Sequence, residues 1–237
     1  MRIFVILPAA GIGTRMSTGA ANPAAPKQFL AIAGTPVLIH TLRAFAAVPR
    51  VTEILIAVRD SELQRVQTQI SEFPVSKKIR AIVGGDSRQQ SVANALASIQ
   101  PAADDIILVH DAVRPLITPA TIDRTIDAIL KTGAAIVALP AVDTIKQVER
   151  TADGAIISST IPRERVVLAQ TPQGALAHLL QRAFAEAATD DFLGTDEASL
   201  LERAGIPVAV VPGSPSNFKV TQPGDLELAE FYLNQRT

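Results

Sequence analysis

The sequence predicts a three-layer α/β fold, in which helices cover both faces of a mostly parallel sheet. Short apolar runs rich in valine and isoleucine alternate with longer segments of helical periodicity, which is the pattern of successive β-α-β units. The chain has 237 residues, of which 48% are hydrophobic, enough to bury one substantial core. We therefore expect a single domain over residues 1–237.

Short apolar segments with the length of buried strands recur along the whole chain. They are Ile3–Leu7, Ile54–Val58, Ile79–Val83, Ile106–His110, Ala135–Leu139 and Val208–Val211. Helical segments lie between them and begin at residues typical of helix N-termini. They are Val37–Val48 after Thr35-Pro36, Glu62–Glu72 after Ser61, and Ala120–Lys131 after Thr118-Pro119.

Two segments interrupt this alternation. Residues 17–26 are small, contain proline and asparagine and have no apolar period, which predicts a surface loop. Residues 142–165 form two alternating runs around Ala152-Asp153-Gly154, which predicts a β-hairpin that projects from the sheet as an arm. The apolar face of this arm needs a partner.

Composition limits the possible partners and the location of the protein. The 22 lysines and arginines nearly balance the 23 aspartates and glutamates, so no general field attracts nucleic acid or an anionic membrane. The absence of cysteine excludes disulfides, thiolate metal sites and cysteine nucleophiles. The first apolar run is far shorter than the roughly 20 residues of a membrane span, and no signal-peptide pattern precedes it. We expect a cytoplasmic protein that binds neither nucleic acid nor membrane.

A glycine-rich turn, Pro8–Met16, follows the first predicted strand. Gly11 and Gly13 allow the backbone to turn tightly and to direct successive N–H groups into one concavity, which favours an anion. A simple tight turn is the alternative interpretation. A dinucleotide site would need a small residue at Met16 and an acidic residue about twenty positions later, and a P-loop would need Gly-Lys-Ser/Thr. Instead, Arg15 and Lys27 follow the turn, which favours a nucleotide phosphate site.

Seven short motifs occur in order along nearly the whole chain. They are Pro-Ala-Ala-Gly-x-Gly-x-Arg-Met at 8–16, Pro-Lys-Gln-Phe at 26–29, Gly-Gly-Asp-x-Arg-x-x-Ser-Val at 84–92, His-Asp-Ala-Val-Arg-Pro at 110–115, Gln-Thr-Pro-Gln at 170–173, Thr-Asp-Glu-Ala at 195–198 and Asn-Phe-Lys-Val-Thr at 217–221. This ordered set resembles the 2-C-methyl-D-erythritol 4-phosphate cytidylyltransferase family. The resemblance implies a Rossmann-like nucleotidyltransferase fold, Mg²⁺ dependence and a homodimer joined through the arm at about 142–165. It also implies the transfer of CMP from CTP to methylerythritol phosphate, with release of pyrophosphate, in non-mevalonate isoprenoid biosynthesis.

The resemblance also implies roles for individual residues. Cations around the triphosphate and its reacting α-phosphate are Arg15, Lys27 and Lys219; residues around the nucleotide are Ala9, Ala10, Gly11, Gly13, Gly85, Asp86, Ser91 and Asp111. Residues on the acceptor side are Asp111, Arg114 and Thr195, while Thr144 and Arg163 reach the acceptor phosphate of the neighbouring subunit. Asp111 is also the expected Mg²⁺ ligand, at the carboxyl edge of the sheet.

Structural interpretations exist for several of these residues. Asp111 and Arg114 can form an ion pair across their loop, Asp86 and Ser91 can cap a helix, and Asp196-Glu197 can cap the helix after Thr195. We assign His110 to packing or a local hydrogen bond. In the arm, Arg165 lies close enough to Arg163 to take its proposed role.

The acceptor explains why no general base is expected. A phosphate monoester is largely deprotonated at neutral pH, so the nucleophile is already ionised, and the barrier lies in bringing two anions together. Three cations and Mg²⁺ meet that need. Two alternatives remain: a ribitol 5-phosphate cytidylyltransferase, which uses the same cations on another polyol phosphate, and a module that binds CTP without turnover.

Overall fold

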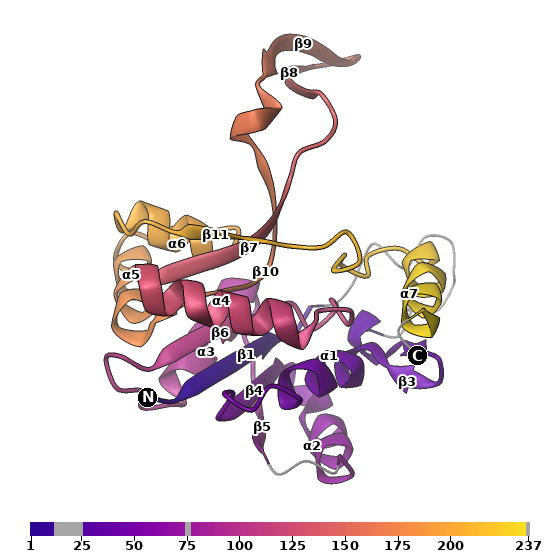
Figure 1. Ribbon diagram of the computed structural model, residues 1–237, viewed down its shortest axis with the longest axis vertical. Helices are drawn as coiled ribbons and strands as arrows, with labels where there is room; N and C mark the ends of the chain where they lie inside the picture. Colours follow the sequence, from indigo (N-terminus) through magenta and orange to yellow (C-terminus); the bar gives the residue numbers. More distant parts are fainter. Residues whose placement is uncertain (12–25, 74–76, 236–237) are drawn as a thin grey trace.

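The computed structural model describes residues 1–11, 26–73 and 77–235. Within these residues a seven-stranded sheet runs in the order β11-β7-β10-β6-β1-β4-β5 (Figure 1). Its strands are β1 (Ile3–Pro8), β4 (Glu53–Val58), β5 (Lys78–Val83), β6 (Ile106–Val109), β7 (Ala134–Pro140), β10 (Val167–Leu176) and β11 (Ala209–Pro212). All neighbours pair in parallel except β10, which is antiparallel to both β6 and β7. The prediction of a mostly parallel sheet is confirmed.

Helices cover both faces of this sheet because its strands are apolar on both sides. On one face, residues such as Val5 and Ile54 pack under α1 (Val37–Ala46), α2 (Leu63–Ser71) and α4 (Pro119–Thr132). Their neighbours Phe4 and Leu55 point to the other face, under α3 (Arg88–Ala97), α5 (Ala177–Thr189) and α6 (Glu197–Arg203). The helix α7 (Gly224–Asn234) packs on a smaller cluster around Val37 and Leu116.

The six predicted strands are present, each within one or two residues of its expected bounds. Among the helix starts, Thr118 is the N-cap of α4, where its side chain accepts a hydrogen bond from the Thr121 backbone N–H. The prediction for Ser61 is wrong: it lies inside a 3-10 turn, η3 (Asp60–Glu62), and α2 starts after it without a side-chain cap. Thr35 is not a cap either, because it belongs to the short strand β3 (Thr35–Pro36), which pairs with β2 (Ala31–Ile32).

The predicted hairpin is also present and stands away from the body of the molecule (Figure 1). Its antiparallel strands are β8 (Ile145–Thr151) and β9 (Gly154–Ile161), followed by the 3-10 turn η4 (Arg163–Arg165). Val148 and Ile157 face each other across the two strands and are 47% and 59% exposed. This arm therefore presents apolar side chains to solvent in the single chain.

The order of the strands determines where a ligand can bind. The chain leaves β1 towards β4 and β5 on one side, whereas β6 lies on the other side of β1. Parallel strands end at a common edge, and in open α/β sheets the crevice at such a reversal is the usual ligand site. The segments that leave β1, β5 and β6 at this edge carry the motifs at residues 8–16, 84–92 and 110–115.

Candidate active site

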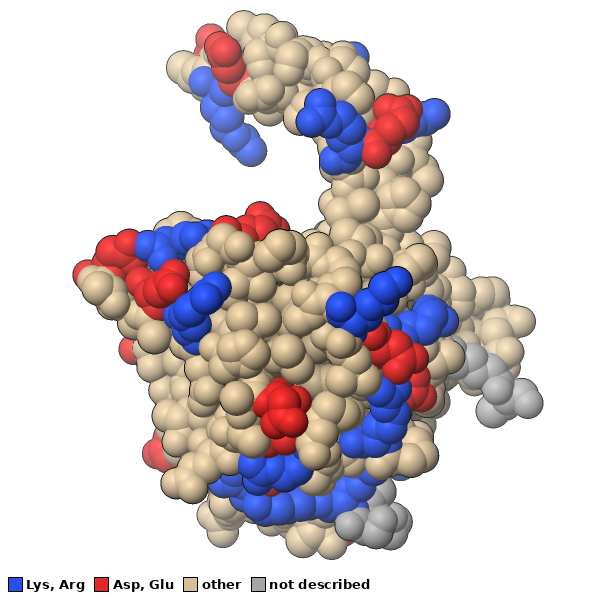
Figure 2. Space-filling view, turned by 60° about the vertical axis from the view of Figure 1, so that its left-hand side comes forward, with Lys and Arg blue, Asp and Glu red and all other residues tan. Residues whose placement is uncertain are grey.

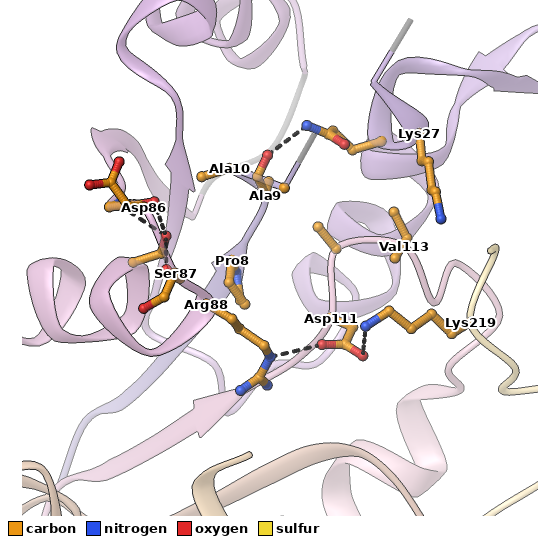
Figure 3. Close-up of a pocket in the computed structure, with 15 residues that line it drawn as sticks. Pro8, Ala9, Ala10, Lys27, Asp86, Ser87, Arg88, Asp111, Val113 and Lys219 are labelled. Carbon is orange, nitrogen blue, oxygen red and sulfur yellow. Dashed lines mark hydrogen bonds and ion pairs between the residues drawn. The ribbon is translucent and has the colours of Figure 1, made fainter. Parts of the chain in front are cut away.

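Two cavities lie at the carboxyl edge of the sheet. The first, of about 250 Å³, is lined by nine of the predicted site residues, drawn in Figure 3 with the other lining residues: Ala9, Ala10, Gly11, Lys27, Gly85, Asp86, Ser91, Asp111 and Lys219. The second, of about 290 Å³, is lined by Arg114 and Thr195 and also by Asp111 and Lys219. Asp111 and Lys219 thus border both cavities.

Asp111 stands at the centre of a cluster of cations. Its Oδ1 accepts a hydrogen bond from Arg88 Nε at 3.2 Å, while Oδ2 lies 3.2 Å from Arg114 Nε and 3.1 Å from Lys219 Nζ. Burial alone would raise the pKa of this carboxyl, but the charges of Lys219, Arg88 and Arg114 outweigh burial and hold the pKa well below its usual value. Asp111 is therefore ionised at neutral pH, and the expected ion pair between Asp111 and Arg114 is present.

Lys27 reaches the first cavity from the short 3-10 helix η2 (Lys27–Phe29). Its side chain is largely buried, and its ammonium donates a hydrogen bond to the Thr221 carbonyl at 2.9 Å. The next residue, Gln28, donates to the Ala9 carbonyl at 2.6 Å and so connects η2 to the end of β1 (Figure 3). Lys27 and Lys219 enter the cavity from segments far apart in the sequence. Gly13 and Arg15, which were predicted beside them, lie outside the described residues.

The turn between β5 and α3 forms the opposite wall of the first cavity. Ser87, and not Asp86 or Ser91, is the N-cap of α3, because its side chain accepts from the Gln90 N–H. The buried Ser91 hydroxyl accepts from the Gly85 N–H at 3.0 Å and donates to the Ser87 carbonyl at 2.9 Å. A Cβ on Gly84 would lie 3.0 Å from the Ala10 Cβ, so glycine permits this turn to approach the end of β1.

Thr195 lies beside the second cavity, just before α6. Asp196 is the N-cap of that helix: its carboxylate accepts from the Ser199 N–H at 2.9 Å, and the Ser199 side chain in turn accepts from the Asp196 N–H. The capping interpretation of Asp196 is thus confirmed. Gln173 also holds this helix start, since it accepts from the Ala198 N–H and donates to Asp196.

His110 is completely buried beneath the site and takes part in local hydrogen bonds, as expected. Its Nε2 lies 3.1 Å from the Arg114 carbonyl and its Nδ1 lies 2.9 Å from the Thr171 hydroxyl. Its ring also packs edge-on against Phe45. Burial lowers the pKa of His110 to about 4. The ring is therefore neutral at pH 7 and fixes the loop after β6.

This buried histidine predicts a pH dependence of stability. In the unfolded chain His110 binds a proton below about pH 6.5. In the folded chain it binds that proton only below about pH 4. The free energy of unfolding should therefore fall as the pH drops through this window, by up to about 3 kcal/mol. Urea unfolding of the wild type and His110→Gln at several pH values would measure it. His178 is exposed, so His178→Gln is the control. An equally steep loss of unfolding free energy in His110→Gln would contradict the prediction.

The arm residues lie apart from both cavities in the single chain. Thr144 and Arg163 line neither of them, and the Arg163 guanidinium donates to the Val142 carbonyl at 2.8 Å within the arm. Figure 2 shows the arm as a hook over the body, with an open gap beneath it. Any contact between Arg163 and a bound acceptor would thus depend on how chains associate.

Sequence reasoning missed two charged residues at this site. Arg88, the first residue of α3, lines both cavities, and Glu197, the first residue of α6, holds its guanidinium with two hydrogen bonds of 2.7 and 2.8 Å. Burial would lower the pKa of Arg88, but Glu197 and Asp111 outweigh burial and raise it. Both residues occur in motifs quoted above, yet they are 109 positions apart. Nothing in either motif indicates that the two side chains meet.

Comparisons with known proteins show which family this chain resembles. A family model described as 2-C-methyl-D-erythritol 4-phosphate cytidylyltransferase matches residues 3–235. Proteins of that name from Acidobacterium capsulatum and Solibacter usitatus are 68% and 50% identical to this chain, covering 100% and 99% of it and 99% and 97% of the relatives. The crystal structure of 2-C-methyl-D-erythritol 4-phosphate cytidylyltransferase from Francisella tularensis superimposes with a TM-score of 0.80 at 33% identity, over 98% of this chain and 99% of that one. The structure of 4-diphosphocytidyl-2C-methyl-D-erythritol synthase from Anaerococcus prevotii has a TM-score of 0.84 at 28% identity, over 98% and 96%.

Proposed function

This chain belongs to the 2-C-methyl-D-erythritol 4-phosphate cytidylyltransferase family, and from that premise we propose that its first cavity binds CTP and its second the acceptor. The protein is a nucleotidyltransferase that transfers CMP from CTP to 2-C-methyl-D-erythritol 4-phosphate, giving 4-diphosphocytidyl-2-C-methyl-D-erythritol and pyrophosphate. One observation carries the assignment of the cavities. Asp111 and Lys219 line both, so two phosphorylated substrates would meet beside these residues.

The reaction requires one phosphoryl displacement. A phosphate oxygen of the acceptor forms a bond to the α-phosphorus of CTP, and the bond from that phosphorus to the bridging oxygen breaks as pyrophosphate leaves. The acceptor phosphate has a second pKa of about 6, so at neutral pH it attacks as a dianion and gives up no proton. The two ring nitrogens of His110 are engaged below the site, in agreement with a mechanism that uses no general base.

In this proposal, cations supply most of the catalysis. Lys27 and Lys219 act as compact charges beside the phosphates, and Arg15 offers two parallel N–H groups to phosphate oxygens. Lys219 is paired with Asp111 at 3.1 Å and is 39% exposed, so its ammonium can turn from the carboxylate towards an incoming triphosphate. Such preorganised charge is most effective where negative charge develops in the transition state.

The nucleoside would lie against the glycine-rich turn and the turn before α3. The group proposed to surround it comprises Ala9, Ala10, Gly11, Gly13, Gly85, Asp86 and Ser91, of which all but Gly13 are described and line the first cavity. Because the Ser91 hydroxyl already bridges Gly85 and Ser87, we propose that its main contribution is to hold the turn in shape. The backbone N–H and carbonyl of Ala9 are already hydrogen-bonded to Ala57 and Gln28, so we propose that the backbone of Ala10 and Gly11 contacts the nucleotide.

Asp111 is the carboxylate best placed to hold Mg²⁺. Its low pKa keeps it ionised, and Mg²⁺ typically uses one or two protein carboxylates together with substrate phosphates and water. The described part of the chain contains no cluster of three or more His, Cys, Asp or Glu residues able to hold a metal, so CTP would have to provide most of the ligands. When bound, the ion would neutralise charge on the triphosphate.

The acceptor would lie between Arg114, Thr195 and Asp111 in the second cavity. We propose that two chains associate through their arms and that Thr144 and Arg163 of one chain reach the acceptor phosphate in the other. Support comes from the apolar residues exposed on the arm and from the fact that, within the described residues of one chain, neither Thr144 nor Arg163 lines the first or the second cavity. The single domain over 1–237 and the cytoplasmic location stay predictions; the described residues include no helix long and apolar enough to span a membrane.

The arm assignment predicts an effect on the acceptor alone. Arg163→Glu should raise the acceptor KM by about tenfold or more, because a charge-assisted phosphate contact is worth about 1.5–3 kcal/mol. The KM for CTP should stay unchanged. Steady-state kinetics with each substrate varied would measure both values. Arg165→Glu is the matched variant: an effect there and none in Arg163→Glu would transfer the role to Arg165.

The proposed dimer gives a second prediction. Ile157→Asp should place a charge on the exposed apolar pair Val148–Ile157 and shift the protein towards monomer in sedimentation velocity. Acceptor KM should rise with the monomer fraction if the arm completes the site of the other chain. Leu130→Asp, on an exposed position of α4, is the control. Wild-type protein that sediments as a monomer at assay concentrations would contradict the proposal.

One assay tests the function directly. Purified protein with CTP and Mg²⁺ is offered methylerythritol phosphate or ribitol 5-phosphate while pyrophosphate is measured. We expect release with methylerythritol phosphate. Release with ribitol phosphate alone would instead indicate the polyol alternative, and binding of CTP without release with either acceptor would indicate a non-catalytic module.

A further inference from the structure

Arg88 links the two cavities through ion pairs with two buried carboxylates. It is the first residue of α3, directly after the Ser87 cap, and its side chain borders both cavities. Its Nη1 and Nη2 donate to the two carboxylate oxygens of Glu197 at 2.7 and 2.8 Å, and its Nε donates to Asp111 Oδ1 at 3.2 Å. One guanidinium therefore contacts both acids (Figure 3 shows the Asp111 side of this contact).

Glu197 holds this guanidinium in one orientation. Its side chain is 1% exposed, and both of its oxygens accept from Arg88 in the parallel geometry that fixes the plane of an arginine. The backbone of the same helix start is held in turn by Gln173 and by the Asp196 cap. The position of Glu197 is therefore determined before any substrate binds.

A direct phosphate contact is the obvious alternative for an arginine in this place. Glu197 occupies the pair of terminal nitrogens and Asp111 occupies Nε, so a bidentate phosphate contact would require the guanidinium to leave one of these carboxylates. Leaving a buried charge without its partner is strongly unfavourable. Lys219 is bound differently: it meets Asp111 through a single ammonium and is 39% exposed, so it can exchange this partner for a phosphate.

We propose that Arg88 is a positioning residue, which Glu197 holds in place so that its Nε fixes the direction of the Asp111 carboxylate. With Oδ1 held by Arg88, Oδ2 is the oxygen shared among Arg114, Lys219 and the incoming ligands. The same contact connects the start of α3, beside the nucleotide cavity, to the start of α6, beside the acceptor cavity. The inference rests on the proposed role of Asp111.

Three variants test the proposal. Glu197→Gln keeps the shape of the side chain and removes its charge. Arg88→Lys keeps the charge but cannot contact both acids in this geometry. The double variant Arg88→Met with Glu197→Leu replaces the buried pair by apolar side chains, a change that commonly restores stability. Each is compared with wild type in thermal stability, kcat, both KM values and the Mg²⁺ concentration that gives half-maximal rate.

We expect kcat to fall by about tenfold to a hundredfold in all three variants, the usual effect of losing a partner that orients a ligand. The Mg²⁺ requirement should change as well, while the KM for CTP stays within about twofold of wild type, since Arg88 does not bind the phosphates in this proposal. In the double variant the kinetic defect should persist although its stability recovers. A purely structural role predicts that activity returns with stability.

Glu53→Gln is the matched control. Glu53 forms comparable ion pairs with Arg80 and Lys78, but it lies at the start of β4 and thus at the opposite edge of the sheet. The Glu53→Gln variant should therefore be less stable than wild type and keep wild-type kinetics. A double variant with wild-type kcat and Mg²⁺ requirement would overturn the proposal, as would variants in which only the KM for CTP rises. If Asp111→Asn is itself fully active, the proposed role of Asp111 fails and not merely the role of Arg88.

Discussion

Lys27→Met should lower kcat by about a hundredfold to a thousandfold, the effect typical of removing one group that stabilises transition-state charge. Methionine keeps the length of the lysine stem up to Cε and much of the volume of this largely buried side chain, so the change chiefly removes the ammonium beside the first cavity. CTP affinity should fall far less than turnover, because the charge is needed most where the α-phosphate reacts. Pyrophosphate release gives kcat, and isothermal titration with CTP gives the binding constant.

The matched control for this prediction is Lys131→Met. Lys131 is exposed near the end of α4, away from both cavities, and the same substitution there should leave kcat unchanged. Normal turnover in Lys27→Met would remove Lys27 from the proposed catalytic cations. An equal loss in kcat/KM and in CTP affinity would reassign it to substrate binding.

The sequence predicted the strands best where a single physical signal dominates. Runs such as Ile54–Val58 are apolar throughout because parallel strands are buried on both faces, and no other pattern competes with that reading. Residues 8–11 of the glycine-rich turn then lie close to the motifs at 84–92 and 110–115, since each follows a strand that ends at the same edge.

The strand β10 was missed for an equally physical reason. It contains Gln170-Thr171-Pro172-Gln173, and proline together with polar residues argues against a central strand. In the structure the pairing of β10 with β7 is irregular between Ala169 and Gln173. The polar residues of that irregularity, Gln170, Thr171 and Gln173, line the second cavity. The local conflict with the strand pattern thus marks part of the site.

The partners of Asp111 illustrate what a sequence cannot supply. Arg114 is three residues away, and an ion pair was among the expected interpretations. Arg88 and Lys219 come from other segments, and only the packing of α3 and of the segment before α7 brings them to the same carboxylate. The irregular segment that carries Lys219 has no periodicity from which its path could be predicted.

Asp111→Asn should lower kcat by at least about a hundredfold, because the proposed metal ligand is lost and the cations around it repel one another. It should also lower the free energy of unfolding by about 3 kcal/mol, which is near the lower end of the range for breaking a buried ion pair. The loss is limited because Arg88 keeps its ion pair with Glu197 and because Lys219 is partly exposed. Pyrophosphate release and urea unfolding measure the two effects. Asp127→Asn, in the exposed pair with Arg50, is the control and should change neither.

The pH dependence of this variant separates the role of the carboxylate from that of the acceptor. The pKa of Asp111 is lowered in the folded protein, so the stabilisation is complete above the unfolded value of about 3.9 and is lost only as the pH falls through the lower, folded value. The difference in unfolding free energy between wild type and Asp111→Asn should therefore stay constant from pH 8 to about pH 5. Turnover of both proteins should still fall below about pH 6, where the acceptor phosphate binds a proton and becomes a weaker nucleophile. An acid limb present in wild type and absent from Asp111→Asn would show instead that Asp111 itself titrates in the working enzyme.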